Sequence, residues 1–172
     1  MMSGVSVVTR SAEETRGVGR ALGSVLARGD LVLLAGDLGA GKTQLAKGIA
    51  DALGVTEPVV SPTFTLAREY AGRVRMVHVD VYRLDRAQEL IDLGLEEEGD
   101  DAVTVIEWGD VAAVHLPHER LEVRLDRLAS DHGEGAGGDA DADDHRLVTI
   151  TPRGPAWSAR DADLDRVLHG IV

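Results

Sequence analysis

Residues Gly36 to Thr43 have the composition and spacing of a phosphate-binding loop. They read Gly-Asp-Leu-Gly-Ala-Gly-Lys-Thr and match the pattern GxxxxGK(S/T). In such a loop the backbone N–H groups surround the phosphates, the lysine reaches the β- and γ-phosphates, and the hydroxyl group binds Mg²⁺. The lysine is Lys42, and the chain has only one other lysine against sixteen arginines. The sequence therefore predicts a site for a nucleoside triphosphate.

Two carboxylates follow stretches that are predicted to be strands. Asp80 ends the extended pattern from Val74 to Val79, and Glu107 ends the apolar run Val103–Ile106. Ligands in open α/β sheets bind at the carboxyl ends of the strands, so both acids are expected beside the loop. A nucleotide hydrolase needs one group that holds Mg²⁺ and one that positions the nucleophile. Strands also end in acids where the chain returns to solvent, and the sequence leaves the two roles unassigned.

Ser61-Pro62-Thr63-Phe64-Thr65 supplies hydroxyl groups about twenty residues after the loop lysine. The proline keeps the residue before it out of a helix, and the hydroxyls are available to a γ-phosphate or Mg²⁺, as in a switch loop. The same hydroxyls could equally cap a turn. The base is expected to be adenine, because the guanine-specific NKxD motif needs an asparagine and the chain has none.

The elements around the loop follow from local periodicity. Leu31–Ala35 is predicted to be a buried strand that enters the loop, and the helix that leaves the loop should end at Gly54. Val5 to Thr9 fits a short first strand. Ser11 and Glu14 form a capping box for a helix that follows it.

The second half of the chain has a different pattern. Strict alternation predicts strands at residues 121–125 and 146–151, which we expect to pair antiparallel at the sheet edge. Between them, Ser130 to Asp144 holds six acids and four glycines and is expected to be a disordered loop. Short helices are predicted near 87–93 and from Ser158 onward.

These elements predict an α/β fold of the P-loop NTPase type. We expect three layers around a mixed, mostly parallel sheet with an antiparallel edge pair. Residues 1–172 would form a single P-loop ATPase domain with the acidic loop 130–144 inside it.

Composition narrows the function classes. The absence of cysteine excludes disulfides, thiolate metal sites and cysteine nucleophiles. No apolar run reaches about 18 residues and no signal peptide is visible, so we expect a cytoplasmic protein with no membrane partner. A net charge of −12 without a basic cluster predicts that contact with nucleic acid is indirect, through a partner protein.

The motif set resembles that of the TsaE (YjeE) family, bacterial ATPases required to form threonylcarbamoyladenosine (t6A) in tRNA. Besides the loop, the resemblance is carried by Ser61–Leu66, by His78-Val79-Asp80-Val81-Tyr82-Arg83-Leu84 and by Ile106-Glu107-Trp108, in the family's order and with similar spacing. It covers roughly residues 5–127. The acidic insert is longer than expected for the family, and the tail after Thr151 carries no family motif.

The resemblance implies a site and partners. The cofactors would be ATP and Mg²⁺, and the partners TsaD and TsaB, which together modify the adenosine beside the anticodon. The ATPase would bind at the interface of that pair, and its hydrolysis cycle would support repeated turnover. Leu38, Gly39, Ala40, Gly41, Lys42 and Thr43 would hold the phosphates, Thr43 and Glu107 would contact Mg²⁺, Asp80 would serve hydrolysis, Thr63 would sense the γ-phosphate, and Trp108 would line the nucleotide site.

Two other functions remain open at the level of sequence. A small-molecule kinase would pass the γ-phosphate to a bound alcohol, although its usual arginine-rich helical lid is not visible: Arg120, Arg124 and Arg127 lie in a stretch with strand periodicity. A nucleotide-dependent interaction module would need no hydrolysis. The leading hypothesis is an ATPase with Lys42, Asp80 and Glu107 as catalytic groups and with low activity alone, because the chain shows no obvious arginine finger.

Overall fold

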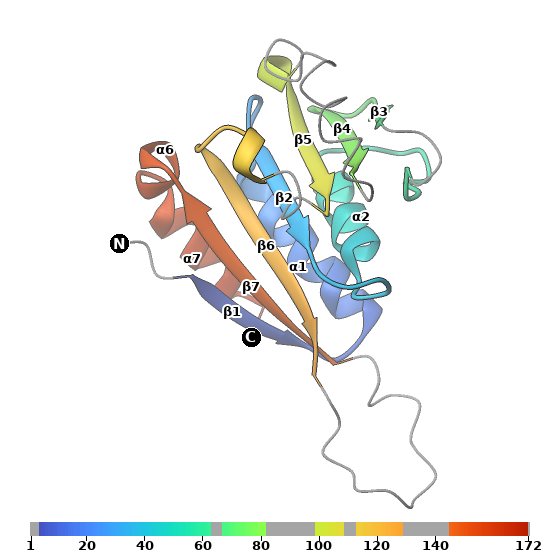
Figure 1. Cartoon of the computed structure of the whole chain (residues 1–172), viewed down its shortest axis with the longest axis vertical. Helices are drawn as coiled ribbons and strands as arrows, with labels where there is room; N and C mark the ends of the chain where they lie inside the picture. The colour runs from blue at the N-terminus through green and yellow to red at the C-terminus, as the bar shows by residue number, and fades with distance from the viewer. Residues whose placement is uncertain (1–3, 63–66, 82–98, 109–112, 129–144, 172) are drawn as a thin grey trace, which may run out of the picture.

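A seven-stranded mixed sheet organises the chain. The computed structural model describes residues 4–62, 67–81, 99–108, 113–128 and 145–171. The strand order is β1-β7-β6-β2-β5-β4-β3 (Figure 1). The strands are β1 (Val5–Thr9), β2 (Leu31–Ala35), β3 (Ala67–Tyr70), β4 (Arg75–Asp80), β5 (Ala102–Glu107), β6 (Arg120–Arg127) and β7 (Arg146–Arg153).

Parallel pairing is confined to the centre of the sheet. β2 lies between β5 and β6 and is parallel to both, and β4 is parallel to β5. The three remaining pairings, β1 with β7, β6 with β7 and β3 with β4, are antiparallel. The carboxyl ends of the central strands therefore lie together, and the predicted phosphate-binding loop follows β2 at that end of the sheet.

The longer helices cover one face of the sheet. In Figure 1 they lie behind it, with α1 and α2 against the centre and α7 towards the edge formed by β1. Their bounds, with those of the short helices, are α1 (Ala12–Val25), α2 (Lys42–Ala52), η1 (Gly99–Asp101), η2 (Ala113–His115), α6 (Pro155–Ser158) and α7 (Asp161–His169). Ser11 caps α1 by accepting from the Glu14 N–H, while the Glu14 carboxylate accepts from the Arg10 N–H.

β2 is buried on both faces. Val32 and Leu34 belong to the large apolar cluster under the helices, whereas Leu31 and Leu33 belong to a smaller cluster on the opposite face. A central parallel strand reads as a continuous apolar run for this reason. In β6 only alternate residues are buried, as the alternating pattern predicts.

The α/β class, the mixed sheet and the antiparallel pair β6–β7 are confirmed. β1 adds a further antiparallel strand outside that pair. β3 has no counterpart among the predicted elements, because three of its four residues are exposed and it shows no apolar alternation. The helix predicted near 87–93 and the acidic loop 130–144 lie outside the described residues.

Gly48 marks a close approach of α2 to α1. A Cβ atom built on Gly48 would lie 2.0 Å from the carbonyl oxygen of Arg16, and that atom belongs to the backbone. We expect Gly48→Ala to separate the helices and to lower the free energy of unfolding in urea by about 3 kcal/mol, because overpacking strains both backbones.

Gly17→Ala in α1 is the matched control. A Cβ atom there would meet only the end of the Arg20 side chain, at 3.9 Å. Because alanine favours the helix, this variant should be as stable as the wild type or about 1 kcal/mol more stable. Equal losses of stability in the two variants would contradict the proposed contact between the helices.

Candidate active site

The loop of residues 36–41, which the sequence predicts to bind phosphate, connects β2 directly to α2. Gly36, Gly39 and Gly41 have φ angles of 144°, 75° and 106°, in a region that favours glycine. A Cβ atom on Gly36 would also lie 2.5 Å from the Leu125 carbonyl oxygen of β6. Gly41 occupies the N-cap position of α2, so the helix begins at Lys42 with its N-terminus turned into the loop.

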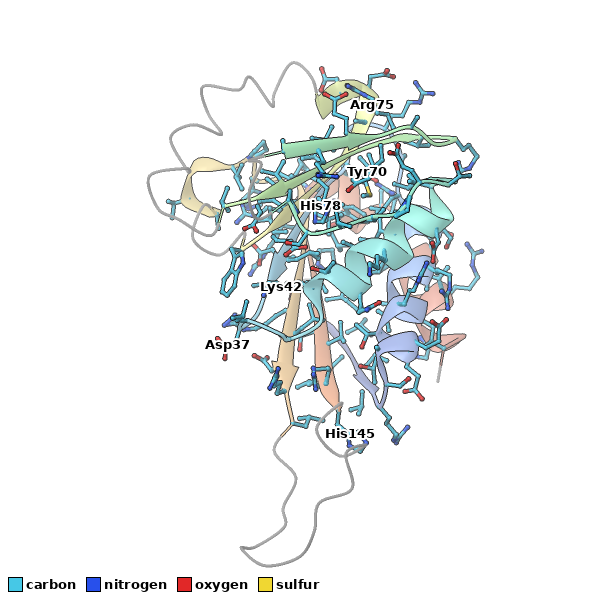
Figure 2. The ribbon with its side chains drawn as sticks, turned by 90° about the vertical axis from the view of Figure 1, so that its right-hand side faces the viewer. Asp37, Lys42, Tyr70, Arg75, His78 and His145 are labelled. Atoms are coloured by element: carbon cyan, nitrogen blue, oxygen red, sulfur yellow. The ribbon has the colours of Figure 1, made fainter. Side chains whose placement is uncertain are left out.

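The ammonium group of Lys42 lies inside the curve of the loop. Nζ donates hydrogen bonds to the carbonyl oxygens of Gly36 at 2.7 Å and Asp37 at 2.9 Å. It also lies 3.8 Å from the centroid of the Trp108 ring, a cation–π contact. Figure 2 shows Asp37 and Lys42 at this corner of the molecule, where α2 begins.

Glu107 is the centre of a buried polar cluster. Its Oε1 atom accepts a hydrogen bond from the Thr43 hydroxyl at 3.2 Å and lies 2.9 Å from Nε2 of His78. Because a carboxylate only accepts, Nε2 carries the proton in this contact. Asp80 pairs with Glu107 in the register of β4 and β5, and both are 3% exposed. The two strand-end acids therefore lie side by side.

His78 is the buried hydrogen-bond partner of Glu107. It is fully buried on β4, and its Nδ1 atom has no hydrogen-bond partner among the described residues. The hydrogen bond from His78 to Glu107 fixes one oxygen of the carboxylate. The segment that contains His78 and Asp80 gave no indication of this contact.

The predicted site residues converge on one cavity of about 450 Å³. It is lined by Leu38, Gly39, Gly41, Lys42, Thr43, Gln44, Ser61, Asp80, Glu107 and Trp108. Ala40 is buried behind the loop and does not line the cavity. Thr63 lies outside the described residues. The cavity has the size of a small-molecule pocket and presents carboxylates, a hydroxyl and an ammonium group together.

The residue types present suit a magnesium–triphosphate complex. Mg²⁺ binds oxygen atoms in octahedral geometry at about 2.0–2.1 Å, which places neighbouring ligands about 2.9 Å apart. The Thr43 hydroxyl and the Glu107 carboxylate are 3.2 Å apart, close to that spacing. Within the described ranges no three His, Asp or Glu side chains form a metal cluster by themselves. Phosphate oxygens would therefore complete the ligand set of such a cation.

Two arginines that sequence reasoning did not select contact the loop from its outer side. Arg127 donates from Nη2 to the Gly39 carbonyl oxygen at 3.1 Å, and Arg146 donates from Nε to the Ala40 carbonyl oxygen at 3.0 Å. The alternating pattern of β6 and β7 could have indicated these contacts. Arg127 follows the buried residues of β6 at the same two-residue spacing, although it is exposed, and Arg146 begins the buried stripe of β7. A buried arginine such as Arg146 requires hydrogen-bond acceptors.

Within the parts of the chain that the structure describes, no helix combines the length and apolar composition needed to cross a bilayer.

Comparison with known proteins gives concordant results. A family model described as threonylcarbamoyl adenosine biosynthesis protein TsaE matches residues 9–134. The tRNA threonylcarbamoyladenosine biosynthesis protein TsaE of Streptomyces coelicolor is 40% identical over 153 residues, which cover 87% of this chain and 97% of that protein. The protein of the same name from Bacillus subtilis is 41% identical over 160 residues and 92% of each chain. The crystal structure of Bacillus subtilis YdiB superposes with a TM-score of 0.77 at 32% identity, covering 96% of this chain and 97% of that one.

Proposed function

Because the chain belongs to the TsaE family of threonylcarbamoyladenosine biosynthesis proteins, we propose that it is a magnesium-dependent ATPase that supports this modification of tRNA. The observation that carries the proposal is the cavity in which the loop lysine, the Thr43 hydroxyl and two buried strand-end acids meet. A site of this composition binds a triphosphate and stabilises the charge that develops during its hydrolysis.

The side chains divide the work. Lys42 would neutralise charge on the β- and γ-phosphates. The backbone N–H groups of the loop and of the first turn of α2 would donate hydrogen bonds to the phosphate oxygens. Thr43 and Glu107 would hold Mg²⁺, which supplies charge neutralisation when bound. Asp80, adjacent to Glu107 and equally buried, would orient the attacking water. Trp108 would border the nucleotide beside Lys42.

The partners are proposed to be the TsaD and TsaB subunits. The net charge of −12 disfavours direct contact with the tRNA backbone, so the chain would act on tRNA only through those proteins. Arg120, Arg124 and Arg127 lie on a strand rather than in a helical lid, and no observation favours a kinase. We propose a cytoplasmic location, where tRNA modification would bring these partners together.

Reconstitution tests the proposal. Purified chain, TsaD and TsaB subunits, unmodified tRNA and the threonylcarbamoyl donor are incubated with ATP or with a non-hydrolysable analogue, and modified adenosine is quantified by mass spectrometry. We expect repeated turnover only with the chain and ATP, together with phosphate release that needs no added acceptor. Equal yields without the chain, or ADP formation that depends on a small alcohol, would contradict the proposal.

A further inference from the structure

We propose that Arg146 and Arg127 are positioning residues that hold the phosphate loop in its binding conformation. This inference rests on the proposed nucleotide binding and adds two residues that lie outside every motif of the chain. Both act on carbonyl groups of the loop and neither lines the cavity itself.

The two arginines form one unit at the end of a hairpin. Arg127 on β6 is the direct cross-strand partner of Arg146 on β7, so their side chains leave the same face of the sheet. That face carries the apolar stripe under the helices, to which Leu125 and Val148 belong. Where the stripe reaches the loop, arginines replace aliphatic residues. Arg146 is only 8% exposed, and a guanidinium at such depth is retained where it has acceptors.

The hydrogen bonds determine the direction of two loop peptides. In a trans peptide the C=O and N–H groups point in opposite directions. Arg146 holds the Ala40 carbonyl, so the N–H of Gly41 in the same peptide points away from β7, and Gly41 lines the cavity. Arg127 holds the Gly39 carbonyl, and the N–H of Ala40 closes a turn onto the Asp37 carbonyl at 3.0 Å.

Arg146 also bridges neighbouring groups. Its Nη2 atom donates to the Gly39 carbonyl at 3.4 Å and its Nη1 atom to the His145 carbonyl at 3.1 Å. One planar side chain therefore links two consecutive loop carbonyls to the backbone of the hairpin. This arrangement fixes the loop before phosphate arrives, and it places positive charge directly behind the phosphate site.

The test compares three variants, Arg146→Met, Arg146→Lys and Arg127→Met, with the control Arg124→Met. Arg124 is exposed and lies on β6, the strand that also carries Arg127. For each full-length variant the unfolding temperature without ligand, and the affinities for ADP and inorganic pyrophosphate with magnesium, are measured. We expect Arg146→Met to weaken both ligands by about tenfold or more, because the Gly41 N–H that Arg146 orients belongs to the part of the cavity that would hold phosphate rather than the base. Arg127→Met should cost about threefold, and Arg124→Met should stay within about twofold.

The outcomes separate the two proposals. If the wild type binds ADP and a folded Arg146→Met variant binds it equally tightly, this inference is overturned but the proposed function is not. That conclusion holds even if the unfolding temperature of the variant falls. If Arg146→Met does not fold, the affinities of Arg146→Lys and of Arg127→Met, at an exposed position, are compared with that of the wild type instead. Unchanged affinity for ADP in both variants would overturn this inference. Failure of the wild type to bind ADP, ATP or pyrophosphate would refute the proposed function and this inference with it.

Discussion

Lys42→Ala is expected to reduce the affinity for ATP by at least about 100-fold in calorimetric titrations with magnesium. The substitution removes the cation that the triphosphate would meet inside the loop. It also removes the donor that joins the Gly36 and Asp37 carbonyls at 2.7 and 2.9 Å, so the loop loses a contact on its inner side. Charge neutralisation and loop geometry therefore fail together.

Lys47→Ala provides the control for this loss of affinity. Lys47 is the other lysine of the chain, lies in the same helix, and does not line the cavity. Removing it changes the net charge by the same amount, and affinity should stay within about twofold of the wild type because the site itself is untouched. If both variants bind ATP as the wild type does, the loop is not the phosphate site.

The site was predictable where it depends on local sequence. The loop pattern, the strand before it and the helix after it occur within about twenty consecutive residues, so periodicity and glycine spacing locate them. Asp80 and Glu107 were placed beside the loop by a general rule about parallel strands, and the pairing of β4 with β5 brings them together.

Long-range contacts were not predictable in this way. The hydrogen bond from Arg146 to Ala40 joins positions 106 residues apart, and that from His78 to Glu107 spans 29. Both contacts depend on strand order, which local patterns do not determine. Strand order instead follows from which apolar faces can be buried together. The roles assigned to all the site residues, to Lys42, Thr43 and Glu107 as much as to Thr63, Asp80 and Trp108, stay predictions. The single-domain organisation also stays a prediction.

Glu107→Gln separates hydrolysis from binding, because the substitution preserves shape while removing charge. Thr43 and His78 both contact the same oxygen, Oε1, and the amide oxygen of glutamine can accept both hydrogen bonds. We therefore expect the variant to fold and to bind ATP within about tenfold of the wild type, with a weaker dependence on magnesium. The rate of phosphate release should fall by about 100-fold or more, because a metal-holding carboxylate is lost.

The same variant decides between an ATPase and a nucleotide-dependent interaction module. If hydrolysis drives repeated turnover, Glu107→Gln should fail to sustain tRNA modification in the reconstituted reaction although it binds ATP. A module that needs only bound nucleotide would sustain modification at the wild-type rate. Glu69→Gln, at an exposed position of β3 paired with Arg75 at 2.9 Å, controls for the loss of one negative charge and should behave as the wild type. Modification that continues while phosphate release is lost would therefore refute the role of hydrolysis and leave the binding site intact.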